Sequence, residues 1–140
     1  CSTQPIFSEY KNMEELKCEL KEKICKYHEE YLCQNLDKAH PYRTTGENYI
    51  KFAKEEPNLF NALYVDEQLE ETKYSEIIEK VKISTGLNDE EANTFHIIMW
   101  FYTHGIATLV ANNTIQLTNE QIQELLNIEF KALMLLERNK

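Results

Sequence analysis

Apolar residues recur at spacings of three and four along most of this chain, which is the period of an amphipathic α-helix. In the first helix the stripe begins after Asn12, a capping residue followed by Glu15 at the third position, and it consists of Met13, Leu16, Leu20, Ile24, Tyr27 and Tyr31. The pattern predicts a helix of roughly 24 residues from Asn12 to Asn35, about 36 Å long.

Proline and glycine set the limits of the next three predicted helices. Pro41 suits the first turn of a second helix, which has to end at Glu56 because Pro57 follows. A short third helix opens at Pro57. After the acidic stretch 66–71, a fourth helix is predicted to end at Gly86.

The fifth helix starts at a capping box, Asn88 with Glu91, and is apolar nearly all round over 95–111. It is therefore predicted to have no solvent face and to form the centre of the domain. Gly105 inside it indicates that another backbone or a ligand comes close at that point.

A last helix follows the capping box of Thr118 and Gln121. Its apolar band is wider than one core contact needs, and the symmetric way to cover it is a second copy. We expect a homodimer built on the last two helices, with an interface of Tyr102, Leu109, Ile122, Leu125, Leu126, Phe130 and Leu133.

Composition narrows the class of protein. The 140 residues include only three Gly and three Pro, too few turn formers for a many-stranded β fold, so a single all-α domain is predicted. The net charge of −9 argues against DNA or an anionic membrane as a direct partner of this chain.

Cysteine spacing and the lack of targeting signals limit the possible disulfides, metal sites and cellular location. Cys18 and Cys25 lie seven residues apart on one predicted helix, about 10 Å, too far for a disulfide, and no zinc motif or other metal site accompanies them. The longest apolar stretch has 17 residues, fewer than a membrane span needs. We expect a cytoplasmic protein without a signal peptide, and a truncated piece of something longer, since the chain begins at Cys1.

Three stretches resemble landmarks of the TetR family of transcriptional regulators. Residues 1–16, CSTQPIFSEYKNMEEL, resemble the end of the recognition helix running through an aromatic pair, Phe7 and Tyr10, into a capped linker helix. Residues 42–60, YRTTGENYIKFAKEEPNLF, are similar to the sensor-domain pattern of aromatic residues, Phe-Ala and Glu-x-Pro. Residues 100–105, WFYTHG, match the signature of the WHG type.

The resemblance implies a helical bundle of about six helices, dimerising through the last two, behind an almost entirely missing helix-turn-helix head. Residues 1–11 would be the remnant of that head, with Ser2, Thr3, Gln4 and Lys11 at the DNA and Lys11 standing in for the usual phosphate-contacting lysine. Residues 12–140 would form the sensing and dimerisation domain of a repressor, which reaches operator DNA only through the head.

Aromatic residues of the second, third and fifth helices suggest where a small apolar or aromatic effector would enter. The predicted ligand-binding residues are Tyr49, Phe52, Phe60, Tyr64, His96, Trp100 and His104. The plainer interpretation stays open: such aromatic residues are core, and His104 is a buried histidine satisfied by a backbone carbonyl.

Catalytic chemistry is not indicated, because no nucleophile sits in a recognisable turn beside a histidine and no glycine-rich phosphate loop occurs. We predict no enzyme, no catalytic residues and no cofactor. The sequence favours a ligand-responsive regulator's sensor domain, in which the effector shifts the linker helix. The alternative is a helical adaptor that docks a protein partner without a small-molecule ligand.

Overall fold

The computed structural model describes residues 12–63 and 71–140, and every regular element among them is a helix. The six helices are α2 (Met13–Leu32), α3 (Pro41–Glu55), α4 (Pro57–Leu63), α5 (Glu71–Thr85), α6 (Asp89–Ala111) and α7 (Asn119–Arg138). The all-α prediction is confirmed. No helix in the described ranges is long and apolar enough to cross a membrane.

The helix ends follow the signals predicted from the sequence. Asn12, Asn88 and Thr118 each accept a hydrogen bond from the backbone N–H three residues later, and the last two form complete capping boxes. Gly86 ends α5 in the left-handed region, at φ 75°. The first helix is shorter than predicted, ending at Leu32, because the turn after it places Asn35 at φ 49°.

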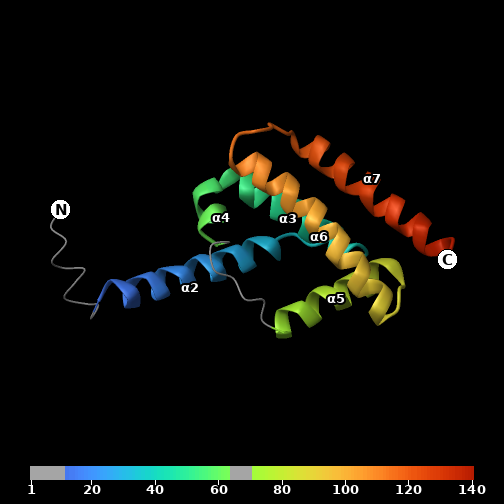
Figure 1. Ribbon diagram of the computed structural model, residues 1–140, viewed down its shortest axis with the longest axis horizontal. Coiled ribbons are helices and arrows are strands. Elements are labelled where there is room, and N and C mark those ends of the chain that lie inside the picture. The colour runs from blue at the N-terminus through green and yellow to red at the C-terminus, as the bar shows by residue number, and fades with distance from the viewer. Residues whose placement is uncertain (1–11, 64–70) are drawn as a thin grey trace.

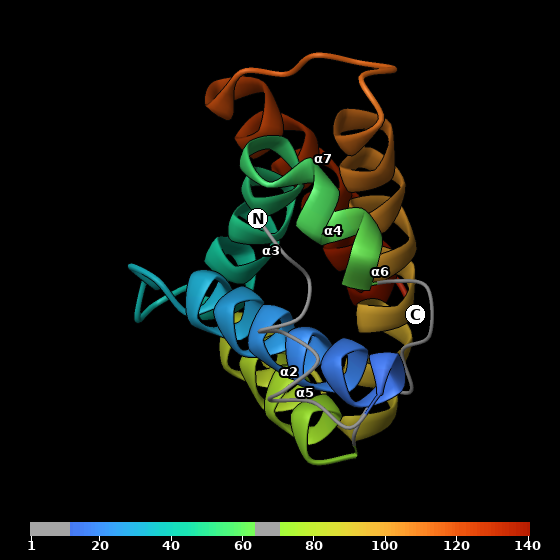
Figure 2. The same cartoon turned by 90° about the vertical axis from the view of Figure 1, so that its left-hand side faces the viewer.

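Helix α3 occupies the centre of the bundle. It packs against α2, α4, α5, α6 and α7, and Ile50, Phe52 and Ala53 are fully enclosed on it. In Figure 1, α6 and α7 run alongside each other with a similar inclination, while α2 extends away from this group toward the N-terminal end. Figure 2 shows α2 and α5 together below α3 and α4, while α6 runs along one side.

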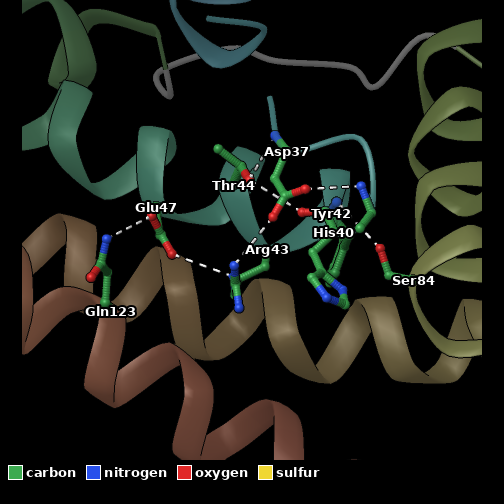
Figure 3. A network of polar contacts seen from close by, with 9 residues as sticks. Asp37, His40, Tyr42, Arg43, Thr44, Glu47, Ser84 and Gln123 are labelled. Atoms are coloured by element: carbon green, nitrogen blue, oxygen red, sulfur yellow. Dashed lines mark hydrogen bonds and ion pairs between the residues drawn. The ribbon is translucent and has the colours of Figure 1, made fainter. Parts of the chain in front are cut away.

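A buried carboxylate links α3 to its neighbours (Figure 3). Glu47, only 8% exposed, lies 3.7 Å from the Nε of Arg43 and accepts a hydrogen bond from Gln123 of α7 at 3.3 Å. Arg43 also pairs with Asp37 at 3.5 Å. Because a charge buried without partners is costly, this network fixes α3 against α7 and against the turn after α2.

One prediction about helix faces is wrong. Helix α6 does have a solvent face in the single chain, since Phe101 is 64% exposed and Leu109 43% exposed. A Cβ at Gly105 would have nothing within 4 Å, so no part of the described chain approaches that position. Near the start of α2, Met13 and Leu20 are also about half exposed.

Candidate functional site

Two tyrosine–histidine pairs connect α3 and α6. The hydroxyl of Tyr49 lies 2.8 Å from Nδ1 of His104, and the hydroxyl of Tyr42 lies 2.9 Å from Nδ1 of His96. The tyrosines are seven residues apart and the histidines eight, so each pair sits two turns from the other along neighbouring helices. The predicted ligand residues His96 and His104 therefore lie in two separate groups of side chains.

The pair around His104 collects most of the predicted ligand residues. The ring of Phe60, from α4, stands perpendicular to Tyr49 at 5.7 Å and lies 5.9 Å from His104. The indole of Trp100 lies 5.8 Å from the same imidazole. Of these four rings, Phe60 has no polar atom, whereas Tyr49, Trp100 and His104 each carry at least one, a combination suited to holding and orienting a small organic molecule.

His28 joins this group from α2, although it is not among the ligand-binding residues predicted from the sequence. Its ring centre lies 5.9 Å from that of Tyr49, and the side chain is only 7% exposed. Its Nε2 is buried and has no hydrogen-bond partner among the described residues. The signal was present in the sequence, because His28 follows Ile24 by four residues and so interrupts the apolar stripe with a polar ring.

We call His28, Tyr49, Phe60, Trp100 and His104 the aromatic–histidine cluster. Burial lowers the pKa of His28 to about 4, against a smaller opposing effect of Glu29, and it also lowers the pKa of His104. At neutral pH both imidazoles are therefore uncharged, each with one N–H donor and one acceptor nitrogen. The cluster is consequently polar without being charged.

Phe52 is a core residue that packs against His28 of this cluster. It is fully buried, and the rings of Tyr27, His28 and Tyr31 surround it at 4.7 to 5.9 Å. Tyr31 continues outward and donates a hydrogen bond of 2.6 Å to Glu55 of α3. Phe52, predicted as a ligand contact, is thus a core residue of the α2–α3 junction. Tyr64, predicted for the same site, lies outside the described residues.

His96 sits in a second group with Tyr42, Tyr74 and Asn93. The Tyr74 hydroxyl donates to Asn93, and its ring lies 5.7 Å from that of His96. Burial lowers the pKa of His96 to about 4 and, with the neighbouring Tyr74, raises that of Tyr42. This group joins α3, α5 and α6, and it takes His96 out of the predicted ligand site.

The predicted dimer residues need a correction. Ile122, Leu126 and Leu133 are at most 8% exposed within the single chain, so they have almost no side-chain surface left for a second copy. Three others are half-buried by contacts inside the chain: the Tyr102 hydroxyl donates to the carbonyl of Leu125 at 3.2 Å, and Phe130 packs on Phe95. Leu109 alone keeps a large exposed area.

An open groove of about 390 Å³ lies between the end of α5 and the second half of α7. It contains none of the predicted ligand residues. Its walls are formed by Ser84, Thr85, Phe130, Lys131, Met134, Leu135 and Arg138.

The remaining predictions concern metal ligands and contacts with DNA. Within residues 12–63 and 71–140, no three His, Cys, Asp or Glu side chains are grouped as a metal site. Cys18, Cys25 and Cys33 form no disulfide among the described residues. The residues predicted as the DNA-binding remnant, Ser2, Thr3, Gln4 and Lys11, lie outside the described residues.

Comparison of the chain with protein-family models, with curated proteins and with solved structures finds no significant match.

Proposed function

We propose that this chain is a sensor domain that binds an uncharged small molecule with an aromatic or apolar body in the aromatic–histidine cluster. The observation that carries the proposal is the buried Nε2 of His28, which has no hydrogen-bond partner in the described chain. A buried polar nitrogen without a partner costs about 1 to 3 kcal/mol. A hydroxyl or amide group of a ligand would remove that cost.

The charge state of the cluster selects the ligand class. His28 and His104 both have lowered pKa values, and the Tyr49 hydroxyl is engaged with His104. A ligand carrying a full charge would lose its hydration among Phe60, Trp100 and Tyr49 without gaining a counter-ion. A neutral hydroxyl can donate to or accept from either tautomer of His28. The fitting ligand is therefore a neutral alcohol, phenol or amide with a ring or alkyl body.

Helix α2 is the element on which such a ligand acts. His28 is its buried residue, and three further contacts tie the same part of α2 to α3. These are the ring contact of Phe52, the bond from Tyr31 to Glu55, and the Asn48 side chain, which donates to the carbonyls of Leu32 and Gln34. A ligand bonded to His28 changes the balance of contacts that sets the position of α2.

The resemblance to TetR regulators indicates what a shift of α2 would affect. A helix that enters the sensor domain from a DNA-reading head would carry the shift to the head, so effector and operator DNA would affect each other's binding reciprocally. In this role the protein is a one-component repressor, and the chain itself contributes sensing. Its acidic net charge of −9 agrees with a part that does not contact DNA.

Trp100 is the single tryptophan of the chain and touches the cluster, so its emission tests the proposal. The chain is titrated with 4-phenyl-1-butanol and, as a charged control of the same body, with 4-phenylbutyrate. We expect saturable binding of the alcohol and weaker binding of the carboxylate. His28→Phe should weaken the alcohol about tenfold, the equivalent of one neutral hydrogen bond. An equal response in His28→Phe would contradict the site.

Native mass spectrometry of the purified chain, followed by extraction under denaturing conditions, gives an independent test. A co-purified neutral organic molecule supports the sensor function. A ligand-free chain that also fails to bind the alcohol favours a helical docking module, for which the exposed Phe101 is the favouring observation.

A further inference from the structure

The groove between the end of α5 and the second half of α7 is positively charged, although the chain as a whole is acidic. Figure 1 shows these two helix ends close together on the right of the view. The residues that line the groove include two cations, Lys131 and Arg138, and no acid, whereas the net charge of the sequence is −9. The groove is therefore a place where this chain can attract an anion.

The charges of Lys131 and Arg138 are not neutralised by acidic side chains of the described chain. Neither residue takes part in an ion pair there. The residues that lie three and four positions from either cation on α7 are uncharged, so no carboxylate of that helix lies one turn away. Glu137, which precedes Arg138, is paired with Lys140 at 2.6 Å. Both positive charges are thus left for a ligand.

Apolar side chains of α7 form the surface between the two cations. Lys131 and Arg138 are seven residues apart, about 10 Å along the helix, and Met134 and Leu135 lie one turn from each of them. Phe130 and Met134 are packed against the hydrophobic core, while Leu135 is 60% exposed. An apolar body placed on this surface would take Leu135 out of water, which is favourable.

The end of α5 supplies a hydroxyl on the other wall of the groove. The backbone N–H of Tyr42 donates to Oγ of Ser84 at 3.4 Å, and no described residue accepts the hydrogen of that hydroxyl. Thr85 differs, because its hydroxyl already donates to the carbonyl of Val81 at 2.8 Å. Ser84 is therefore the residue of α5 that can donate a hydrogen bond to an acceptor oxygen in the groove.

We propose that this groove binds a carboxylate with an alkyl body of about eight carbons, which lies along α7 and pairs with the cation at one end. At a C–C bond length of about 1.5 Å, an extended chain of that size spans about 10 Å, the separation of Lys131 and Arg138 along the helix. The groove volume of about 390 Å³ is within the range of small-molecule sites, roughly 300 to 1,000 Å³. The charged end gains a charge-assisted hydrogen bond that a neutral molecule of the same length lacks.

This groove is separate from the aromatic–histidine cluster. No residue of the cluster lines it, and the two sites select opposite ligand classes, since the cluster disfavours a charged group and the groove requires a negative one. Trp100 is not a lining residue, so its emission reports on the cluster and not on the groove. The inference therefore does not rest on the proposed function, and either can fail without the other.

The three methionines of the chain allow the groove to be observed directly. Met134 lines the groove, Met99 is buried in the core, and Met13 lies at the start of α2. In a chain labelled with ¹³C-methyl methionine, octanoate should shift the Met134 signal to saturation and leave the Met13 signal in place. Octane-1,2-diol and octylammonium, a neutral and a cationic molecule with the same alkyl chain, should shift the Met134 signal less at equal concentration. Met134→Leu assigns the signal.

Charge variants test the two cations. Lys131→Gln combined with Arg138→Gln should weaken octanoate binding about tenfold, the equivalent of two exposed ion pairs. Lys17→Gln combined with Lys26→Gln on α2 changes the net charge equally and is the matched control, because neither lysine lines the groove. This control should change the dissociation constant by less than about twofold, since distant exposed charges are screened by salt.

A second pair of variants adds an acid inside or outside the groove. Leu135 and Ile128 are 60% and 57% exposed on the same helix, and of the two only Leu135 lines the groove. Leu135→Glu should weaken octanoate at least about tenfold, because it removes apolar surface and repels the carboxylate. Ile128→Glu adds the same charge and should leave the binding nearly unchanged. Both side chains are exposed, so both variants should fold like the native chain.

Three results would overturn the proposal. The first is an octanoate titration that leaves the Met134 signal in place. The second is equal weakening by the two double lysine and arginine variants, which would mean that octanoate responds only to net charge. The third is a Met134 signal that moves with protein concentration and not with octanoate, which would assign the groove to contact with a second copy of the chain.

Discussion

The hydroxyl oxygen of Tyr49 lies 2.8 Å from Nδ1 of His104, although the two residues are 55 positions apart in the chain. The bond joins the central helix α3 to α6 at the place where Phe60 and Trp100 also meet the imidazole. It therefore serves both the packing of the bundle and the polarity of the candidate ligand site.

Removing the Tyr49 hydroxyl should lower the free energy of unfolding modestly. Tyr49→Phe keeps the ring and loses one neutral hydrogen bond, which corresponds to about 1 kcal/mol. Urea denaturation measures the difference. Tyr42→Phe, which removes the equivalent bond to His96 at 2.9 Å, is the matched variant and should cost a similar amount. An unchanged free energy of unfolding in both variants would mean that these hydrogen bonds are no more favourable than the bonds that the same groups make with water in the unfolded chain.

Acidification should destabilise the domain through His28 and His96. Above pH 6.5 both are neutral in the folded and unfolded chain, but burial holds their folded pKa values at about 4. As the pH falls from 6.5 toward 4, only the unfolded chain takes up these protons, so stability is lost with falling pH. The loss reaches at most about 1.4 kcal/mol per pH unit for each histidine.

Urea denaturation at pH 7, 6 and 5 separates this effect from the general response to acid. His28→Gln and His96→Gln should each show a smaller drop between pH 7 and pH 5 than the native chain. The exposed His40, replaced by Gln, provides the matched control. If all three variants lose stability as steeply as the native chain, the two buried histidines are not the cause.

Phe52 should behave as a core residue. It is fully buried between α2 and α3, so Phe52→Ala removes packing from three neighbouring rings and should cost about 3 to 5 kcal/mol. That is a large part of the stability of an ordinary domain. Thermal unfolding followed by circular dichroism measures it. A cost below 1 kcal/mol would show that the α2–α3 junction is loosely packed.

Gly86 should resist substitution although space surrounds it. Its φ of 75° lies in the left-handed region, while a Cβ would meet nothing within 4 Å, so any effect comes from the backbone alone. Gly86→Ala should destabilise by about 1 kcal/mol, because an L-residue is strained in that conformation. Gly86→Asn should lose less, because Asn tolerates the left-handed region better. Equal urea midpoints for Gly86→Ala and the native chain would contradict this.

The sequence by itself determined the helices and most of their ends. Capping at Asn88 and Thr118, Pro41 and Pro57 at helix starts, and Gly86 at a helix end all act within about four residues of their own position. Such local hydrogen bonds and dihedral limits can be recognised in a sequence without knowing the rest of the fold. The same information predicted an all-helical domain.

Only the tertiary structure decided which apolar residues are covered and which polar residues meet. Two apolar stripes of α7 look alike in sequence, yet Leu126 is buried by α3 and Ile128 is not. His28 became part of the candidate site only because α2 crosses α3 there, and the partners of His96 and His104 come from more than 50 residues away. Helix periodicity fixes which residues share a face, but the packing of one helix on another decides what that face meets.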